Sequence, residues 1–175
     1  KELIFKKKSG LLIGTVIDFP LGDKEHSFKV AEAKNAISLG IDELDFVANY
    51  NLFKRGSLEL FDNEIIEGVK IAFKHNKIIK WIIETDALSN EEIFNISKRI
   101  SSIVNDNFLS YARNVFIKTC TGYYGGDGAQ VKDIKIIKSA IKNLRIKASG
   151  GIKTRRQCER LVKAGVDRIG TSKAM

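Results

Sequence analysis

The sequence predicts an α/β protein in which βα units follow one another around a parallel sheet. Six segments of strand length alternate with segments of helical spacing. One helix-to-strand junction occurs twice, since Ser38–Leu44 resembles Lys163–Ile169 in having a helix end, a glycine, a β-branched residue, an aspartate and a strand. No linker, low-complexity segment or change in composition divides the chain, so residues 1–175 are expected to form a single domain.

Each element is predicted from its own pattern. Strands are expected at Leu11–Phe19, Leu44–Ala48, Ile78–Thr85, Val115–Cys120, Arg145–Ala148 and Asp167–Gly170. Helices are expected at Phe28–Leu39, Leu58–His75, Glu91–Val104, Val131–Lys142 and Arg155–Ala164. Gly40 occupies the position after a helix end, and Ser89 with Glu92 forms a predicted capping box.

The net charge of +9, from 30 Lys and Arg against 21 Asp and Glu, is the strongest compositional feature. It favours either an anionic partner or a solvated, lysine-rich surface. The lysines are spread along the chain and only Lys6–Lys8 form a run, so we prefer the second interpretation. No stretch reaches the roughly 18 apolar residues of a membrane span, and no signal peptide is visible. No membrane partner is therefore expected, and the two cysteines fit a reducing cytoplasm.

Polar side chains gather where the predicted strands end, and in α/β proteins the carboxyl ends of parallel strands carry the functional residues. Among them are Asp45, Glu84, Lys118 and Lys147. A lone lysine at a strand end could simply extend to solvent. Lys118 and Lys147, however, occupy the same position in consecutive strands, so we expect them to be neighbours.

Two neighbouring lysines indicate a reactivity that a single lysine does not. Close ammonium groups disfavour each other's charge, which lowers the pKa of one of them. A lysine that is a neutral amine is a nucleophile toward carbonyl groups, so the pair predicts Schiff-base chemistry. A metal site is not expected, because His26 and His75 lie far apart and no His, Cys and Asp spacing forms a ligand set.

Glycine-rich segments follow the two lysine strands and the last strand. They are Thr121–Gly126, Gly150–Gly151 and Gly170–Ser172. Backbone N–H groups in such loops bind anions, although glycine also serves where a turn is merely tight. No GxGxxG or Walker A sequence is present, so a dinucleotide or nucleoside triphosphate is not expected. Six strands alone would favour an open doubly wound sheet over an eight-stranded barrel, but the polar strand ends favour the barrel.

The chain resembles the deoxyribose-phosphate aldolase family, class I aldolases on a TIM (β/α)8 barrel. The matching segments, in the family's order, are Thr15–Gly22, Glu32–Lys34, Gly40–Asp45, Ile82–Thr85, Phe116–Gly122, Lys147–Ile152 and Ala164–Ser172. The resemblance implies that about six βα units, strands three to eight, are present. The family's first two strands would precede Lys1, Lys1–Lys8 would end the preceding helix, and the last helix would follow Met175.

The resemblance also implies residue roles. Lys118 would form the Schiff base, Lys147 would lower the pKa of that lysine, and Asp45 would act with a water in proton transfer. The phosphate site would comprise Thr121, Gly122, Gly150, Gly151, Gly170 and Ser172. The implied reaction is reversible cleavage of 2-deoxy-D-ribose 5-phosphate to D-glyceraldehyde 3-phosphate and acetaldehyde. Neither a metal nor an organic cofactor is implied, and a cytoplasmic homo-oligomer, such as a dimer, is expected.

Three residues depart from the family's pattern. Cys120 stands where serine is usual, Lys173 where a second serine is common, and Asp86 where small or apolar residues are more usual. Three alternatives stay open at this stage. They are another phospho-sugar Schiff-base enzyme such as a transaldolase-like barrel, an inactive fragment of the aldolase, and a basic nucleic-acid-binding domain. The last is disfavoured because the aromatic residues occupy apolar periodic positions.

Overall fold

The computed structural model describes residues 10–173 and shows an α/β fold with six parallel strands. The strands pair in chain order and comprise β1 (Gly14–Ile17), β2 (Glu43–Val47), β3 (Ile78–Ile82), β4 (Val115–Lys118), β5 (Arg145–Ser149) and β6 (Arg168–Gly170). The helices are α2 (His26–Ser38), α3 (Tyr50–Lys54), α4 (Leu58–Lys74), α5 (Asn90–Phe108), α6 (Val131–Ala140) and α7 (Arg155–Ala164), with 3-10 helices η1 (Thr85–Ala87) and η2 (Leu109–Asn114).

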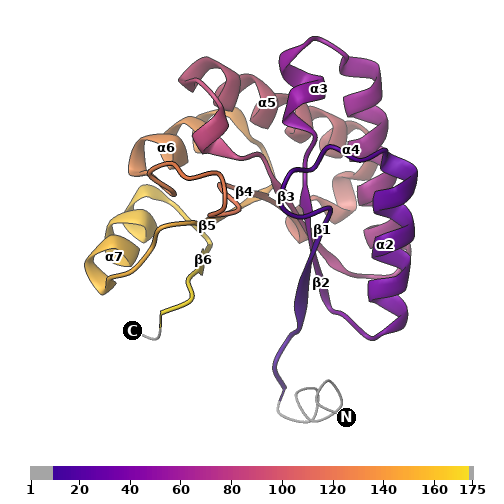
Figure 1. The fold of residues 1–175 in the computed structure, drawn as a ribbon, viewed down its shortest axis with the longest axis horizontal. Coiled ribbons are helices and arrows are strands. Elements are labelled where there is room, and N and C mark those ends of the chain that lie inside the picture. The colour runs from indigo at the N-terminus through magenta and orange to yellow at the C-terminus, as the bar shows by residue number, and fades with distance from the viewer. Residues whose placement is uncertain (1–9, 174–175) are drawn as a thin grey trace.

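The sheet curls, and the helices are arranged along its outer side (Figure 1). The curl brings β6 back toward β2, because Arg168 on β6 contacts Glu43 on β2 although four strand pairings separate them. The predicted alternation of strands and helices is therefore confirmed, and the architecture is a partial (β/α) barrel rather than a flat doubly wound sheet. The helix end expected within Lys1–Lys8 lies outside the described residues.

The repeated junction has a physical basis. Gly40 and Gly165 both adopt positive φ after a helix, at 87° and 109°, which glycine does without a Cβ penalty. The aspartate that follows then pairs twice with the neighbouring strand. Asp42 donates its N–H to Ile13 O and accepts from Ile13 N, and Asp167 makes the same two bonds with Ile146. The repeat therefore fixes the start of two strands in register with their neighbours.

The alternation of side chains along the strands separates two faces. On the outer face Trp81 of β3 packs against Phe46 of β2, with ring centroids 5.0 Å apart. It also packs against α4 at Gly68, where a Cβ would lie only 2.5 Å from the indole ring. The inner face carries charged residues instead, including Asp45, Lys80 and others described below. The buried outer face forms the hydrophobic core, whereas the inner face carries the charged residues of the candidate active site.

Several element boundaries differ from those predicted. β1 is shorter than Leu11–Phe19, because Leu11 and Leu12 are exposed and precede its first pairing residue, Gly14. Asp45 lies within β2 rather than at its end. α5 continues to Phe108, and its predicted capping box between Ser89 and Glu92 is present. α3, η1 and η2 were not predicted.

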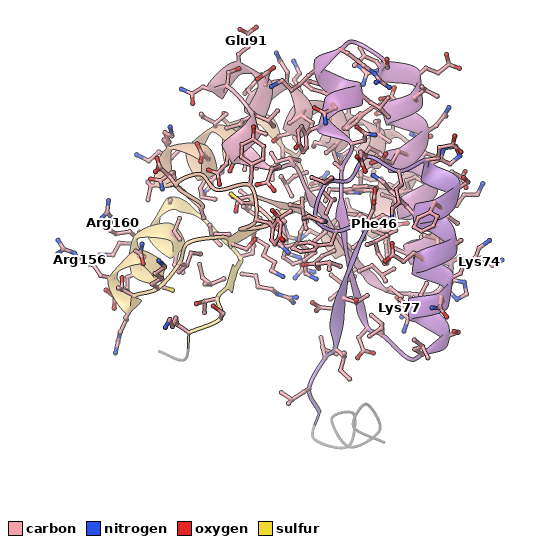
Figure 2. All side chains as sticks on the ribbon, viewed as in Figure 1. Phe46, Lys74, Lys77, Glu91, Arg156 and Arg160 are labelled. Atoms are coloured by element: carbon pink, nitrogen blue, oxygen red, sulfur yellow. The ribbon has the colours of Figure 1, made fainter. Side chains whose placement is uncertain are left out.

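Basic side chains are exposed on the helical surface. Figure 2 shows Lys74, Arg156 and Arg160 extending away from the body of the protein, and all three residues are exposed. This distribution agrees with a solvated lysine- and arginine-rich surface. Within residues 10–173, no helix combines the length and the apolar character that crossing a bilayer requires.

Candidate active site

Three lysines converge on one carboxylate inside the curled sheet. Lys118 Nζ and Lys147 Nζ donate to Asp45 Oδ2 over 2.7 and 2.8 Å, and Lys80 Nζ donates to Asp45 Oδ1 over 2.5 Å. Lys118 and Lys147 are paired in the register of β4 and β5, as the sequence predicts. All three predicted catalytic residues, Asp45, Lys118 and Lys147, therefore come together.

Lys80 is a functional candidate that sequence reasoning missed. Its side chain is 1% exposed and bridges Asp45 to Glu43, whose Oε2 lies 2.8 Å from Lys80 Nζ. Glu43 also accepts from Arg168 Nη1 at 2.6 Å. The sequence does contain a sign of the role of Lys80, namely a lysine between apolar neighbours in Ile78–Ile82, because buried lysine is rare unless it is paired.

These contacts define a lysine cluster of four cations and two anions, namely Lys80, Lys118, Lys147, Arg168, Glu43 and Asp45. Burial on its own would raise the pKa of Asp45, but its lysine partners hold that pKa well below its usual range. Burial and the charge of Lys118 lower the pKa of Lys147, and the Asp45 carboxylate offsets part of this effect. The surplus of buried positive charge favours loss of a proton from one lysine, which leaves a neutral amine.

A cavity of about 370 Å³ opens directly onto the lysine cluster. Its lining includes Lys118, Lys147 and all six residues predicted for the phosphate site, which are Thr121, Gly122, Gly150, Gly151, Gly170 and Ser172. Lys153 and Thr171 also line it and were not predicted. The cavity therefore joins the candidate nucleophile to a glycine-rich, cationic wall.

The glycine loops are held in close contact at this wall. Gly150 adopts φ +94°, and a Cβ there would lie 3.0 Å from the Cβ of Cys120. Gly122, at φ +80°, packs directly against Gly150. Thr119 ties the two strands together below the loops, since its hydroxyl donates to Ser149 O and accepts from Ser149 N. Glycine at these positions permits the turn and exposes backbone N–H groups to an anion.

Another buried lysine, outside the lysine cluster, supports the loop between β1 and α2. Lys29, 1% exposed, donates to the carbonyl oxygens of Gly22 and Val47 at 2.8 Å each. Its charge is compensated by Glu64 at 3.0 Å and Asp18 at 3.4 Å. These bonds fasten the loop after β1 to the end of β2, so we interpret Lys29 as a residue that stabilises this edge.

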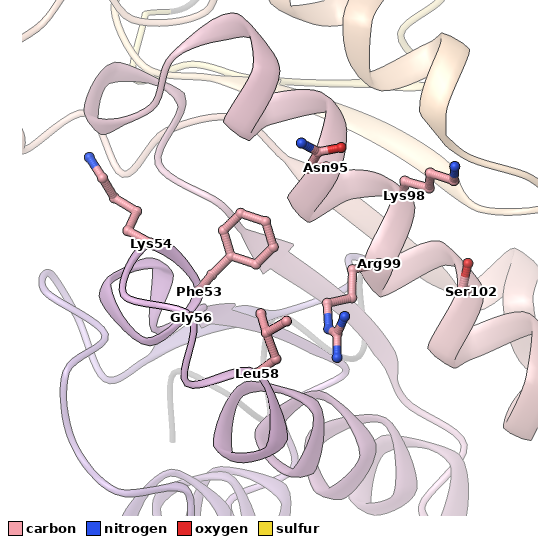
Figure 3. Close-up of a pocket in the computed structure, with 8 residues that line it drawn as sticks. All are labelled: Phe53, Lys54, Gly56, Leu58, Asn95, Lys98, Arg99 and Ser102. Atoms are coloured by element: carbon pink, nitrogen blue, oxygen red, sulfur yellow. The ribbon is translucent and has the colours of Figure 1, made fainter.

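A larger cavity lies elsewhere in the described part of the chain. It has a volume of about 520 Å³ and is formed between α3, the start of α4 and α5, with Phe53, Leu58 and Arg99 in its lining (Figure 3). Arg99 is already paired with Asp62 on α4. The cavity lies in the helical layer and contains none of the lysine cluster, so we do not consider it the active site.

Comparison with known proteins finds relatives that share one name. The deoxyribose-phosphate aldolase of Dictyoglomus turgidum is 40% identical over 173 residues, which cover 98% of this chain and 73% of that protein. The deoxyribose-phosphate aldolase of Mycoplasmoides pirum is 43% identical over 171 residues, with coverages of 95% and 72%. No family model matches the chain.

Solved structures agree with these sequence relatives. The aldolase QR15 superposes with a TM-score of 0.80 at 34% identity, over 93% of this chain and 68% of that one. The tetrameric deoxyribose phosphate aldolase from Aeropyrum pernix superposes with a TM-score of 0.79 at 28% identity, over 97% and 68% of the two chains. On the strength of these relatives and of the fold they share with it, this chain belongs to the deoxyribose-phosphate aldolase family.

Proposed function

We propose that this protein is a deoxyribose-phosphate aldolase, an aldehyde-lyase that reversibly cleaves 2-deoxy-D-ribose 5-phosphate to D-glyceraldehyde 3-phosphate and acetaldehyde. The observation that carries the proposal is the convergence of Lys118, Lys147 and Lys80 on Asp45 at the wall of the 370 Å³ cavity. Membership of the aldolase family supports the same reaction.

Lys118 is the proposed nucleophile. As a neutral amine its Nζ adds to the C1 aldehyde, and loss of water gives a protonated imine. The imine then accepts the electron pair of the C2–C3 bond, which breaks to leave an enamine on Lys118. Protonation of the enamine at C2 and hydrolysis release acetaldehyde and restore the amine. This covalent route supplies the electron sink from the protein's own side chain.

Asp45 is the proposed carboxylate of the proton relay. Its Oδ2 lies within 2.8 Å of both Lys118 Nζ and Lys147 Nζ, so it is close to the reacting atoms. Acting through a water, it takes the proton of the C3 hydroxyl as the C2–C3 bond breaks. General acid–base assistance of this kind is worth about 10²–10⁴-fold in rate. The lowered pKa of Asp45 keeps it ionised near neutral pH.

The substrate phosphate is proposed to bind at the glycine-rich wall. Gly150, Gly151 and Gly170 offer backbone N–H groups there, Ser172 offers a hydroxyl, and Lys153 adds a charge. The cavity spans from these residues to Lys118, so one extended sugar phosphate would contact both.

The reaction is tested by product analysis. The protein is expected to convert 2-deoxy-D-ribose 5-phosphate to acetaldehyde and D-glyceraldehyde 3-phosphate, measured with coupled reduction of each aldehyde. Transfer of a longer keto-sugar fragment without acetaldehyde would support the transaldolase-like alternative. Absence of any product, with the protein folded, would support an inactive fragment.

Removing the positive charge of Lys147 is expected to change the pH dependence of the reaction. Burial and the nearby charge of Lys118 lower the pKa of Lys147, so the two ammonium groups disfavour each other, and Lys147→Leu removes this repulsion beside Asp45. The acidic limb of kcat against pH should shift to higher pH, and the rate near neutrality should fall. Lys135→Leu removes the same charge from an exposed position on α6 and should leave the profile in place. An unshifted profile in Lys147→Leu would remove Lys147 from the proposed role.

Adding a methyl group at the phosphate wall is expected to weaken phosphate recognition selectively. Gly150→Ala places a Cβ 3.0 Å from Cys120 at positive φ, so the loop must move. One lost charge-assisted hydrogen bond corresponds to about 10–100-fold in kcat/KM. The ratio of kcat/KM for 2-deoxyribose 5-phosphate to that for 2-deoxyribose should fall, and this ratio cancels any loss of folded enzyme. An equal loss for both substrates would place the phosphate elsewhere.

We also propose an assembly and a location for the protein. A homo-oligomer, such as a dimer, fits a relative whose structure is described as tetrameric, and a cytoplasmic location fits the two cysteines of the chain. Light scattering after size exclusion measures the mass of the assembly.

A further inference from the structure

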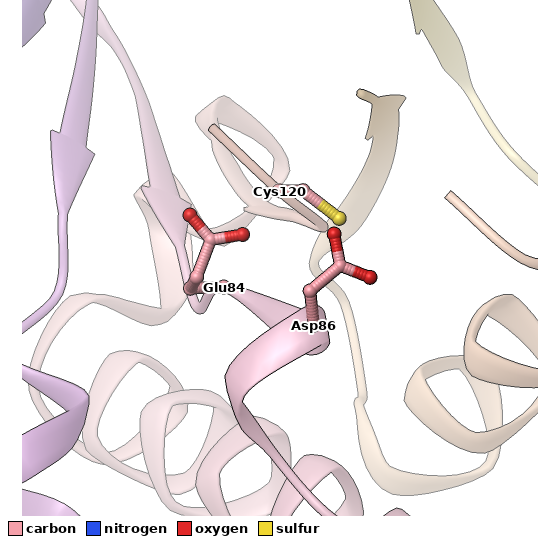
Figure 4. Close-up of side chains that lie close together, drawn as sticks. All are labelled: Glu84, Asp86 and Cys120. Atoms are coloured by element: carbon pink, nitrogen blue, oxygen red, sulfur yellow. The ribbon is translucent and has the colours of Figure 1, made fainter. Parts of the chain in front are cut away.

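Three potential metal ligands meet beside, but outside, the lysine cluster. They are the carboxylates of Glu84 and Asp86 and the thiol of Cys120, which provide ligand atoms within 4.8 Å of one another. Figure 4 shows the three side chains facing a common space, with Glu84 and Asp86 from the segment after β3 and Cys120 from the end of β4. None of the three has a role in the proposed aldol reaction. We call this group the Glu84–Asp86–Cys120 cluster.

Each potential ligand is held in place by a hydrogen bond from a different neighbour. Thr121 donates its N–H to Glu84 Oε2 over 3.1 Å, and its hydroxyl donates to the same oxygen. Gly128 N donates to the Asp86 carboxylate over 3.2 Å. Thr85 Oγ1 lies 3.0 Å from Cys120 Sγ, where its hydroxyl can donate to a thiolate. Outer hydrogen bonds of this kind orient ligands in protein metal sites.

One ligand atom is buried without a partner. Glu84 is 2% exposed, and its Oε1 has no hydrogen-bond partner among the described residues although Oε2 has two. The backbone at Glu84 also adopts φ +55°, which is costly for a residue with a side chain. A buried carboxylate oxygen without a donor loses the free energy of its hydration, and a bound cation would restore it.

The surroundings of the cluster are acidic in a protein of net charge +9. Asp86 lies close enough to Glu84 and to Asp133 for the carboxylate charges to repel one another, and Asp127 adds to the repulsion at Asp133. The opposing cations near these groups are Lys118, which faces Glu84, and Lys132, which faces Asp133. A divalent cation would relieve this local repulsion.

Asp86 and Cys120 come from different segments of the chain, and the fold brings them together. Gly126 makes room for Asp86, since a Cβ there would lie 2.4 Å from Asp86 Cγ. The sequence could not reveal this juxtaposition, because the two residues follow different strands.

We propose that Glu84, Asp86 and Cys120 bind a zinc ion. Zinc accepts carboxylate oxygen and thiolate sulfur together, at about 2.0–2.2 and 2.3 Å, and commonly keeps water as a remaining ligand in sites with three protein ligands. On binding, the Cys120 thiol proton is released to solvent and a zinc–sulfur bond forms, with no change in oxidation state. The ion would join the segment after β3 to the end of β4 and, through Gly128, to the loop before α6.

Cobalt(II) is the probe for this site, because a cobalt–thiolate bond gives a charge-transfer band in the near ultraviolet. Titration of the whole protein with cobalt is expected to give such a band that saturates at one ion per chain and is lost on addition of zinc. Cys120→Ser should abolish the band. Cys158→Ser, which replaces the other cysteine on α7, should retain it.

Two further variants test whether cobalt binds at a site whose ligands are oriented by neighbouring residues, rather than at Cys120 alone. Thr85→Val keeps the shape of the side chain but removes the hydroxyl beside Cys120, so cobalt affinity should fall by about 10–100-fold. Asp86→Asn, at a half-buried position, should cost more because it removes a ligand charge. Circular dichroism checks that each variant is folded, and these two variants decide the matter if Cys120→Ser does not fold.

The proposal is overturned by a titration without a thiolate band, by a band that persists in Cys120→Ser, or by one that is lost in Cys158→Ser. Unchanged affinity in both Thr85→Val and Asp86→Asn would also overturn it. The titration requires no substrate, so its outcome is independent of whether the protein is an aldolase.

Discussion

Replacement of Lys118 by leucine is expected to lower kcat by at least about 10⁴-fold, because the reaction loses its covalent route and not merely a contact. Leucine preserves most of the aliphatic volume of a side chain that is only 9% exposed. It also removes one cation from a cluster with surplus positive charge, so the fold is expected to survive. Activity is measured as acetaldehyde release from 2-deoxyribose 5-phosphate.

A matched control is available in the same cavity. Lys153 lines the cavity and is exposed, and it makes none of the contacts with Asp45. Lys153→Leu should therefore weaken binding of the phosphorylated sugar but keep turnover at saturating substrate. If Lys118→Leu retained a kcat within tenfold of the parent, Lys118 would not be the nucleophile.

Asp45→Asn is expected to impair both catalysis and stability. The rate should fall by about 10²–10⁴-fold, since asparagine cannot accept the C3 hydroxyl proton. Loss of the carboxylate also leaves the buried Lys80 and Lys118 and the half-buried Lys147 without their shared anion, which costs about 3–5 kcal/mol of unfolding free energy. Activity assays and urea unfolding measure the two effects separately.

The stability effect of Asp45→Asn has a definite pH dependence. Asp45 has a lowered pKa in the folded protein, so its stabilisation is complete above the unfolded carboxyl pKa of about 4 and is lost as pH falls below it. The difference in unfolding free energy between parent and variant should therefore be largest near neutral pH and shrink in acid. Asp106→Asn, at an exposed position on α5, should show little difference at any pH. A constant difference for Asp45→Asn would contradict the ion-pair account.

The parts of the site that the sequence predicted are those whose position follows from strand order. Lys118 and Lys147 follow buried runs in consecutive strands, and consecutive parallel strands place equivalent positions side by side. The glycine segments could be predicted for the same reason. Lys80 was missed although it lies between apolar residues of β3, because its partner Asp45 belongs to a different strand and the contact depends on register.

The same distinction applies to the helices. A helix end marked by nearby residues in the sequence could be predicted, whereas a helix that depends on tertiary contacts could not. The start of α5 could be predicted because Ser89 and Glu92 cap it within four residues of sequence. α3 could not, because it depends on contacts made in the folded chain. Asn49 caps it by accepting from Leu52 N, and Asn49 N is itself held by Glu64 from α4. Five residues with such a cap carry too little periodicity to be recognised on their own.

The central claim is that Lys118, among three lysines on one carboxylate, forms the Schiff base. It is tested most directly by adding 2-deoxyribose 5-phosphate and borohydride, which reduces an imine to a stable secondary amine, and by locating the modified lysine by peptide mass spectrometry. The account predicts modification at Lys118 in the parent protein and in Lys153→Leu, and none in Lys118→Leu. Modification of Lys147 or Lys80 in the parent, or unchanged labelling of Lys118→Leu, would contradict it.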